Sequence, residues 1–123
     1  MIKIPKEIES VMLIDSEYID RYISLKVLES HGVPNVLTFD NINKAIDHLQ
    51  ETTNKYQFVL IGLHKPIMDN FEFIEKLKES ELLKTQGQIC FLSASVYPED
   101  KERFRKRKIK FIEKPLTMEK LLN

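Results

Sequence analysis

Short, mostly apolar runs of four to six residues recur five times along this chain. They are too short to be helices and lack the polar alternation of a half-exposed strand, which is typical of strands buried on both faces of a sheet. We therefore predict five strands, at 11–14, 36–39, 58–63, 89–92 and 109–112.

Between these runs the apolar residues change to helical spacing. The first helix is predicted from Ile19, Tyr22, Ile23 and Val27, and Gly32 with Pro34 should end it. Later helices are predicted around 42–49, around 71–77, from Pro98 and around 118–122, the second capped by Asn41 or Asp40 and the short last one by Thr117. Regular alternation of strand and helix predicts an α/β domain with a parallel sheet, and 123 residues suit one domain over 1–123.

Composition excludes several classes of protein. Lys+Arg and Asp+Glu both number 19, so no net charge favours nucleic acid or an anionic membrane as a partner. The one cysteine, Cys90, excludes a disulfide framework and is expected in the core. Because no signal-like segment or long apolar run is present, we expect a soluble, cytoplasmic protein.

Function in an open α/β sheet collects at the carboxyl ends of the strands. The residues expected there are Asp15 with Ser16, Gly62, Ser93, and Lys114 followed by Pro115. Gly62 has no side-chain oxygen, so it offers no nucleophile and no metal ligand.

In three stretches the chain resembles the receiver domains of two-component response regulators. These stretches are 11–15, 66–73 and 111–116, and their order and spacing make the match specific. The resemblance implies a CheY-like, flavodoxin-like, doubly wound sheet of five parallel strands in the order 2-1-3-4-5, with a short last helix.

The resemblance also implies a role for each residue at the strand ends. Asp15 matches the first of two magnesium-binding acids, and Ser16 stands where the second acid is found. Gly62 stands where the family has the aspartate that accepts a phosphoryl group from a histidine kinase. The residues that would contact that group or respond to it are Ser93, Lys114 and the switch aromatic Phe111.

The two departures remove two of three expected carboxylates. Since Mg²⁺ usually takes carboxylates as its protein anchors, we expect it to bind weakly or not at all, with no other cofactor. We expect Asp15 to pair directly with Lys114, and aspartyl phosphorylation to be impaired or absent.

Simpler interpretations stay open for the same residues. Asp15 or Ser16 can cap the helix that follows, and Ser93 can be a turn hydroxyl. Lys114 can be solvated, and Gly62 can mark a close approach of backbone to backbone.

Three functions follow from these interpretations. The first is a non-enzymatic signalling module that binds a protein, such as a histidine kinase or an output protein, through the fourth helix, fifth strand and fifth helix. The basic run at 101–108 lies in this region, although a solvated helix face explains it equally. The second is a non-covalent sensor of an anion in the space that Gly62 vacates. A flavodoxin-like electron carrier is third, and the acidic start of 15–18 disfavours it because it would repel phosphate.

Overall fold

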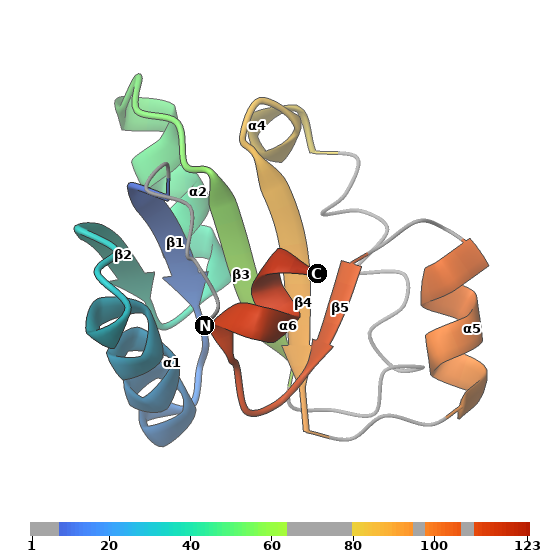
Figure 1. Cartoon of the computed structure of the whole chain (residues 1–123). Coiled ribbons are helices and arrows are strands. Elements are labelled where there is room, and N and C mark those ends of the chain that lie inside the picture. Colours follow the sequence, from blue (N-terminus) through green and yellow to red (C-terminus); the bar gives the residue numbers. More distant parts are fainter. Residues whose placement is uncertain (1–7, 64–79, 95–97, 107–109) are drawn as a thin grey trace.

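The computed structural model describes residues 8–63, 80–94, 98–106 and 110–123. Its centre is a parallel sheet of five strands in the order β2-β1-β3-β4-β5, as predicted (Figure 1). The strands are β1 (Ser10–Ile14), β2 (Asn35–Phe39), β3 (Phe58–Leu63), β4 (Gln88–Ser93) and β5 (Lys110–Glu113). The order reverses at β1 and β3, which is where such sheets form their functional crevice.

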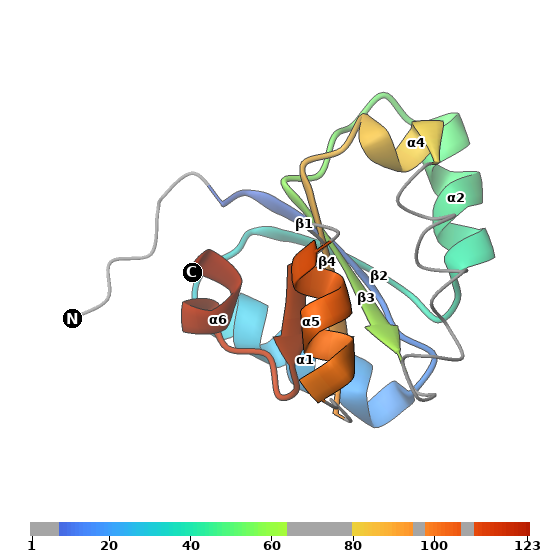
Figure 2. The ribbon, with the colours of Figure 1, turned by 90° about the vertical axis from the view of Figure 1, so that its right-hand side faces the viewer.

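Helices cover both faces of this sheet. The described helices are α1 (Tyr18–Ser30), α2 (Ile42–Glu51), α4 (Glu81–Lys84), α5 (Pro98–Lys106) and α6 (Met118–Leu122). Seen along the sheet, α2 and α4 lie on one side and α1 and α6 on the other (Figure 2). The helix predicted from Phe71, Ile74 and Leu77 lies outside the described residues. Among the described helices, none is long and apolar enough to cross a bilayer.

The two faces of the sheet bury two separate cores. One core joins the α2 face to Phe104 of α5, and the other joins the α1 face to Leu116 and α6. Successive residues of a strand point to opposite faces, so β1 and β3 supply both cores and are buried along most of their length. The prediction of strands without polar alternation is confirmed for these two strands, and it explains why they sit at the centre.

Local signals in the sequence set several helix ends correctly. Gly32 adopts a φ of 82° just after α1, a conformation that costs other residues a steric clash. Asn41 caps α2 by accepting a hydrogen bond from the Lys44 backbone N–H at 2.9 Å, and Thr117 caps α6 through the Lys120 N–H at 3.1 Å. The helix α5 begins at Pro98, as predicted.

The orientation of α1 was not evident from its apolar spacing. The helix is present, yet Ile19, Tyr22 and Ile23 face solvent, while Ser24 and Leu28 are the buried residues. The helix is apolar on more than one side, so its periodicity indicates a helix without indicating the face that packs on the sheet.

Candidate functional site

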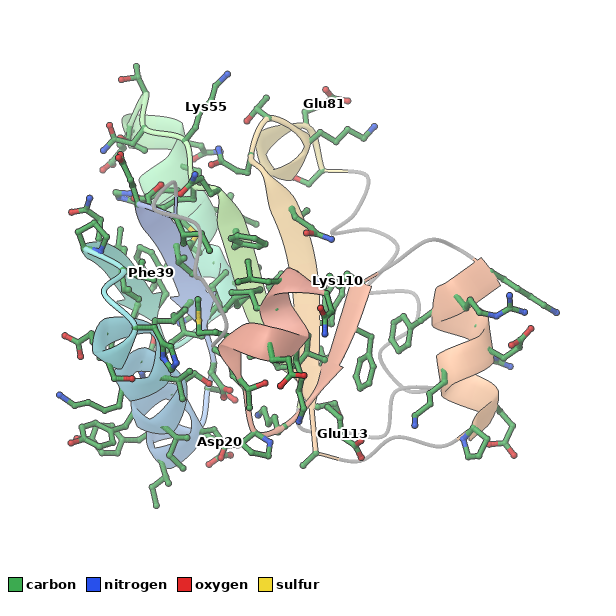
Figure 3. The ribbon with its side chains drawn as sticks, viewed as in Figure 1. Asp20, Phe39, Lys55, Glu81, Lys110 and Glu113 are labelled. Carbon is green, nitrogen blue, oxygen red and sulfur yellow. The ribbon has the colours of Figure 1, made fainter. Side chains whose placement is uncertain are left out.

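The ends of four strands meet at one edge of the sheet, as the topology requires. Asp15 directly follows β1, Gly62 is the next-to-last residue of β3, Ser93 ends β4 and Lys114 directly follows β5. The Lys114 backbone N–H donates to the Ser93 carbonyl at 2.9 Å, which fixes these two ends to each other. Figure 3 marks this end of the molecule by Asp20 and Glu113, and the opposite end by Lys55 and Glu81.

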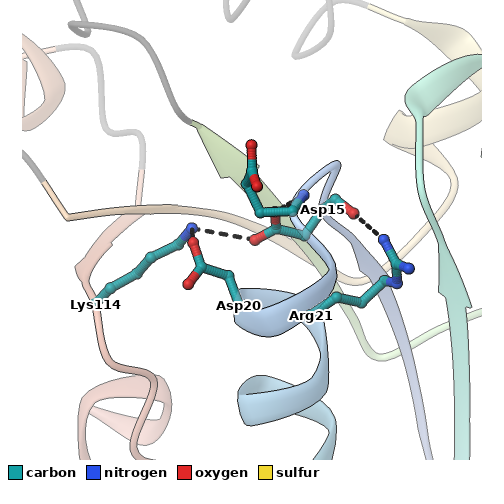
Figure 4. A network of polar contacts seen from close by, with 5 residues as sticks. Asp15, Asp20, Arg21 and Lys114 are labelled. Carbon is teal, nitrogen blue, oxygen red and sulfur yellow. Dashed lines mark hydrogen bonds and ion pairs between the residues drawn. The ribbon is translucent and has the colours of Figure 1, made fainter.

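Asp15 is the centre of a buried polar network (Figure 4). The residue is 1% exposed. Its Oδ1 accepts a hydrogen bond from the Glu17 backbone N–H at 2.9 Å, and its Oδ2 accepts one from Lys114 Nζ at 3.1 Å. The Arg21 side chain donates to the Asp15 carbonyl oxygen at 2.6 Å. A buried carboxylate is costly unless it is paired and hydrogen-bonded, and these contacts meet that requirement.

The expected ion pair between Asp15 and Lys114 is therefore present, and it has a third member. Lys114 Nζ also lies 2.9 Å from Asp20 Oδ2, and the lysine side chain is only 10% exposed. One ammonium group thus pairs with two carboxylates, and the Arg21 guanidinium is a second cation nearby. Lys114 is not the solvated lysine of the simpler interpretation.

The reason for a glycine at position 62 is steric. A Cβ built on Gly62 would lie 2.2 Å from Asp15 Oδ2 and 2.5 Å from Asp15 Cγ. Real Cβ atoms essentially never approach another heavy atom closer than 3.0 Å. The interpretation of Gly62 as a backbone-to-backbone approach is wrong, because the close neighbour is the Asp15 side chain.

The same observation corrects the idea of a vacated space beside Lys114. The Asp15 carboxylate fills the volume into which a side chain at position 62 would extend. A surface cavity of about 650 Å³ lies instead at the amino ends of β1 and β2, where Ser10, Asn35 and Tyr56 are among the residues lining it.

The helix-capping interpretations are also corrected. The N-cap of α1 is Glu17, whose side chain makes no capping hydrogen bond. Asp15 instead accepts from the backbone two residues later, which is the turn that aspartate side chains commonly form. Ser16 is exposed at the rim of the network, and Ser93 is buried at 1% exposure.

Phe111 lies in β5, away from the ion pairs, and contacts α5. Its ring stacks on that of Phe104, with centroids 5.3 Å apart and planes 9° from parallel. Phe104 is buried in the core on the α2 face, so this stack connects β5 to α5. A change of Phe111 rotamer stays a prediction.

Within the part of the chain that the structure describes, the donors at this site do not fit Mg²⁺. Both oxygens of Asp15 already accept hydrogen bonds, and one oxygen of Asp20 is taken by Lys114. Positions 16 and 62, where the resemblance implies two further carboxylates, hold Ser16 and Gly62. A cation would also have to displace the Lys114 ammonium group from Asp15.

Sequence analysis missed Asp20 and Arg21. An acid in the first turn of a helix is ordinarily assigned to the helix dipole, and Arg21 follows it on the same turn. The sequence did contain a weak signal for these two residues. Because α1 begins just after Asp15, the side chains of its first turn have to lie near the site.

Comparison with known proteins places the chain among signalling domains. The family described as the response regulator receiver domain matches residues 11–123. A two-component response regulator from Cytophaga hutchinsonii has a similar fold, with a TM-score of 0.77 and 24% identity over 96% of this chain and 94% of that one. No curated protein matches the sequence significantly.

Two further solved structures support the same fold. A response regulator receiver protein from Dyadobacter fermentans has a TM-score of 0.74 and 24% identity, covering 92% of this chain and 91% of that one. The chemotaxis protein CheY4 of Vibrio cholerae has a TM-score of 0.64 and 22% identity, covering 94% and 93%. At such identities these structures show the fold alone.

Proposed function

This chain belongs to the response regulator receiver domain family, and from that premise we propose that it signals without phosphorylation of an aspartate. It acts as a non-enzymatic interaction module of a two-component pathway. The observation that carries this proposal is the position of the Asp15 carboxylate in the volume required by a side chain at residue 62.

Phosphorylation of a carboxylate requires an oxygen that can reach an incoming phosphorus atom. Position 62 has no such oxygen. Among the described residues, the carboxylate of Asp15 lies next to Gly62, and its side chain has 0% exposure and two oxygens engaged by Glu17 N–H and Lys114. Attack by Asp15 would require breaking a buried ion pair, which costs about 3–5 kcal/mol before any chemistry begins.

The lysine is also held in a different role from the one that the resemblance implies. Lys114 is not available to a phosphoryl group, because it forms ion pairs with Asp15 and Asp20 in the unmodified chain. The carboxylates of Asp15 and Asp20 thus occupy the ammonium group that would bind a phosphoryl group. Signalling then depends on contact with another protein.

The proposed contact face consists of α5, β5 and α6. Basic side chains gather in the last turn of α5, where Arg105 and Lys106 are exposed. The partner is a histidine kinase or an output protein, and a surface with this charge suits an acidic patch on it. Neither nucleic acid nor a membrane is proposed as a partner.

A non-covalent anion sensor is the weaker candidate. Lys114 and the Ser93 hydroxyl are suitable donors in principle, yet two carboxylates face the same ammonium group. An incoming anion would have to displace Asp15 from Lys114 and would be repelled by it.

The test is treatment of the full chain with acetyl phosphate and Mg²⁺, and separately with beryllofluoride. We expect unchanged amide NMR shifts and an unchanged intact mass, while a receiver with an acceptor aspartate, treated in parallel, is modified. A stable phosphoryl adduct on any aspartate of this chain would refute the proposal. Shift changes with inorganic phosphate alone would support the sensor.

A further inference from the structure

Four large apolar side chains of α1 project into solvent. We call them the α1 patch: Tyr18 and Ile19, each 68% exposed, Tyr22 at 50% and Ile23 at 44%. Among the described residues the other exposed large apolar side chain is Leu37, at 36%, on β2. The exposed apolar surface of the described chain is therefore concentrated on one helix.

The α1 patch is continuous and ordered by its own contacts. The rings of Tyr18 and Tyr22 stack with centroids 6.4 Å apart. The Arg21 guanidinium lies 5.7 Å from the Tyr18 ring centre, and the Lys26 ammonium lies 5.4 Å from that of Tyr22. Aromatic rings held in this way lose little side-chain entropy when a second surface packs on them.

The size of the patch suits the core of a modest interface. Its four side chains expose on the order of 500 Å², which lies in the upper part of the roughly 300–600 Å² that the largest apolar patch of a monomer covers, and such patches are often functional. A standard interface takes about 800 Å² from each partner, of which a polar rim supplies part.

The charged residues around the α1 patch indicate which molecule binds it. Its amino-terminal end carries the exposed acid Glu17, and its carboxyl-terminal end carries the exposed base Lys26, which also lies 3.5 Å from Glu29 of its own helix. When two α1 helices lie antiparallel over their patches, Lys26 of each copy approaches Glu17 of the other, and the helix dipoles oppose favourably. The formal net charge of zero adds no long-range repulsion between copies.

We propose that this face binds a second copy of the chain, in a symmetric dimer with the two α1 helices antiparallel. The patch residues all belong to α1 and none lies on α5, β5 or α6, so the dimer does not depend on the proposed function. Because Asp20 and Arg21 lie in the first turn of α1 and Asp15 lies three residues before that helix, the dimer would also border the buried ion pairs.

The first experiment measures the mass of the full chain by sedimentation velocity over a wide concentration range. We expect a reversible monomer–dimer equilibrium that Ile19→Lys shifts to monomer by at least tenfold in Kd. Leu37→Lys is the matched control, since it adds the same charge at another exposed apolar site, and it should leave Kd unchanged. A wild-type chain that stays monomeric at millimolar concentration would overturn the proposal and leave the α1 patch for a different protein.

The second experiment tests the antiparallel register with surface charges alone. Glu17→Lys and Lys26→Glu should each weaken the dimer by roughly threefold to tenfold, because each breaks two symmetric ion pairs. The double variant, which restores opposite charges across the interface, should recover most of the affinity. Additive weakening in the double variant would contradict the register, and circular dichroism checks that each variant is folded.

Discussion

The side chain of Asp15 occupies the place of a side chain at residue 62, since a Cβ on Gly62 would lie 2.2 Å from Asp15 Oδ2. The two positions therefore constrain each other: a side chain at residue 62 fits only if the Asp15 carboxylate moves from its place beside Lys114. The absence of an acceptor and the pairing of the lysine are one structural arrangement rather than two independent changes.

Gly62→Ala should destabilise the fold by about 1–3 kcal/mol, because the added methyl group forces Asp15 away from Lys114. The loss should be smaller in an Asp15→Ala background, in which the methyl group has room. Urea unfolding of the four chains of this double-mutant cycle measures the coupling. Equal losses in the two backgrounds would show that another neighbour limits residue 62.

Lys114→Met should cost about 3 kcal/mol, since it leaves the carboxylate of Asp15 buried without its ammonium partner. Lys84→Met is the control, because Lys84 is 53% exposed and its change should fall within about 0.5 kcal/mol of wild type. Similar unfolding midpoints for the two variants would mean that the buried pair contributes little.

Gly62→Asp should create a divalent-cation site. It adds a third carboxylate beside Asp15 and Asp20, and the new side chain moves the Asp15 carboxylate away from Lys114. Millimolar Mg²⁺ should then raise the melting temperature of this variant by several degrees while leaving wild type and Gly62→Asn unchanged. Stabilisation of wild type by the same Mg²⁺ concentration would contradict the donor argument above.

The Cys90 thiol should resist alkylation in the folded protein. Burial raises the pKa of Cys90 from 9.0 to about 11, so the reactive thiolate is scarce at neutral pH. The unfolded chain ionises at the lower pKa, so stability should fall as the pH rises from about 9 to 11, by linkage. A dye-based thiol assay with and without denaturant measures the protection, and rapid labelling of the native protein would show that the site opens.

The strands and the position of the site could be predicted from local patterns in the sequence, whereas the strand order came from the resemblance to the receiver family. Short apolar runs specify strands, and parallel strands linked by helices place Asp15 and Lys114 at one edge although they are far apart in the chain. Opposite charges at the carboxyl ends of two strands of one sheet then made their pairing predictable, and the structure confirms it.

Other features required the tertiary structure, because they depend on distances between segments and on the way a helix is rotated. The sequence shows that residue 62 is glycine, but only the approach of β1 to β3 shows that Asp15 fills its place. Likewise, the apolar spacing of α1 indicates a helix, whereas the rotation that buries Leu28, exposes Ile19 and turns Asp20 toward Lys114 follows from packing on the sheet. Local periodicity determines which elements form, and the burial of surface between elements determines which side chains meet.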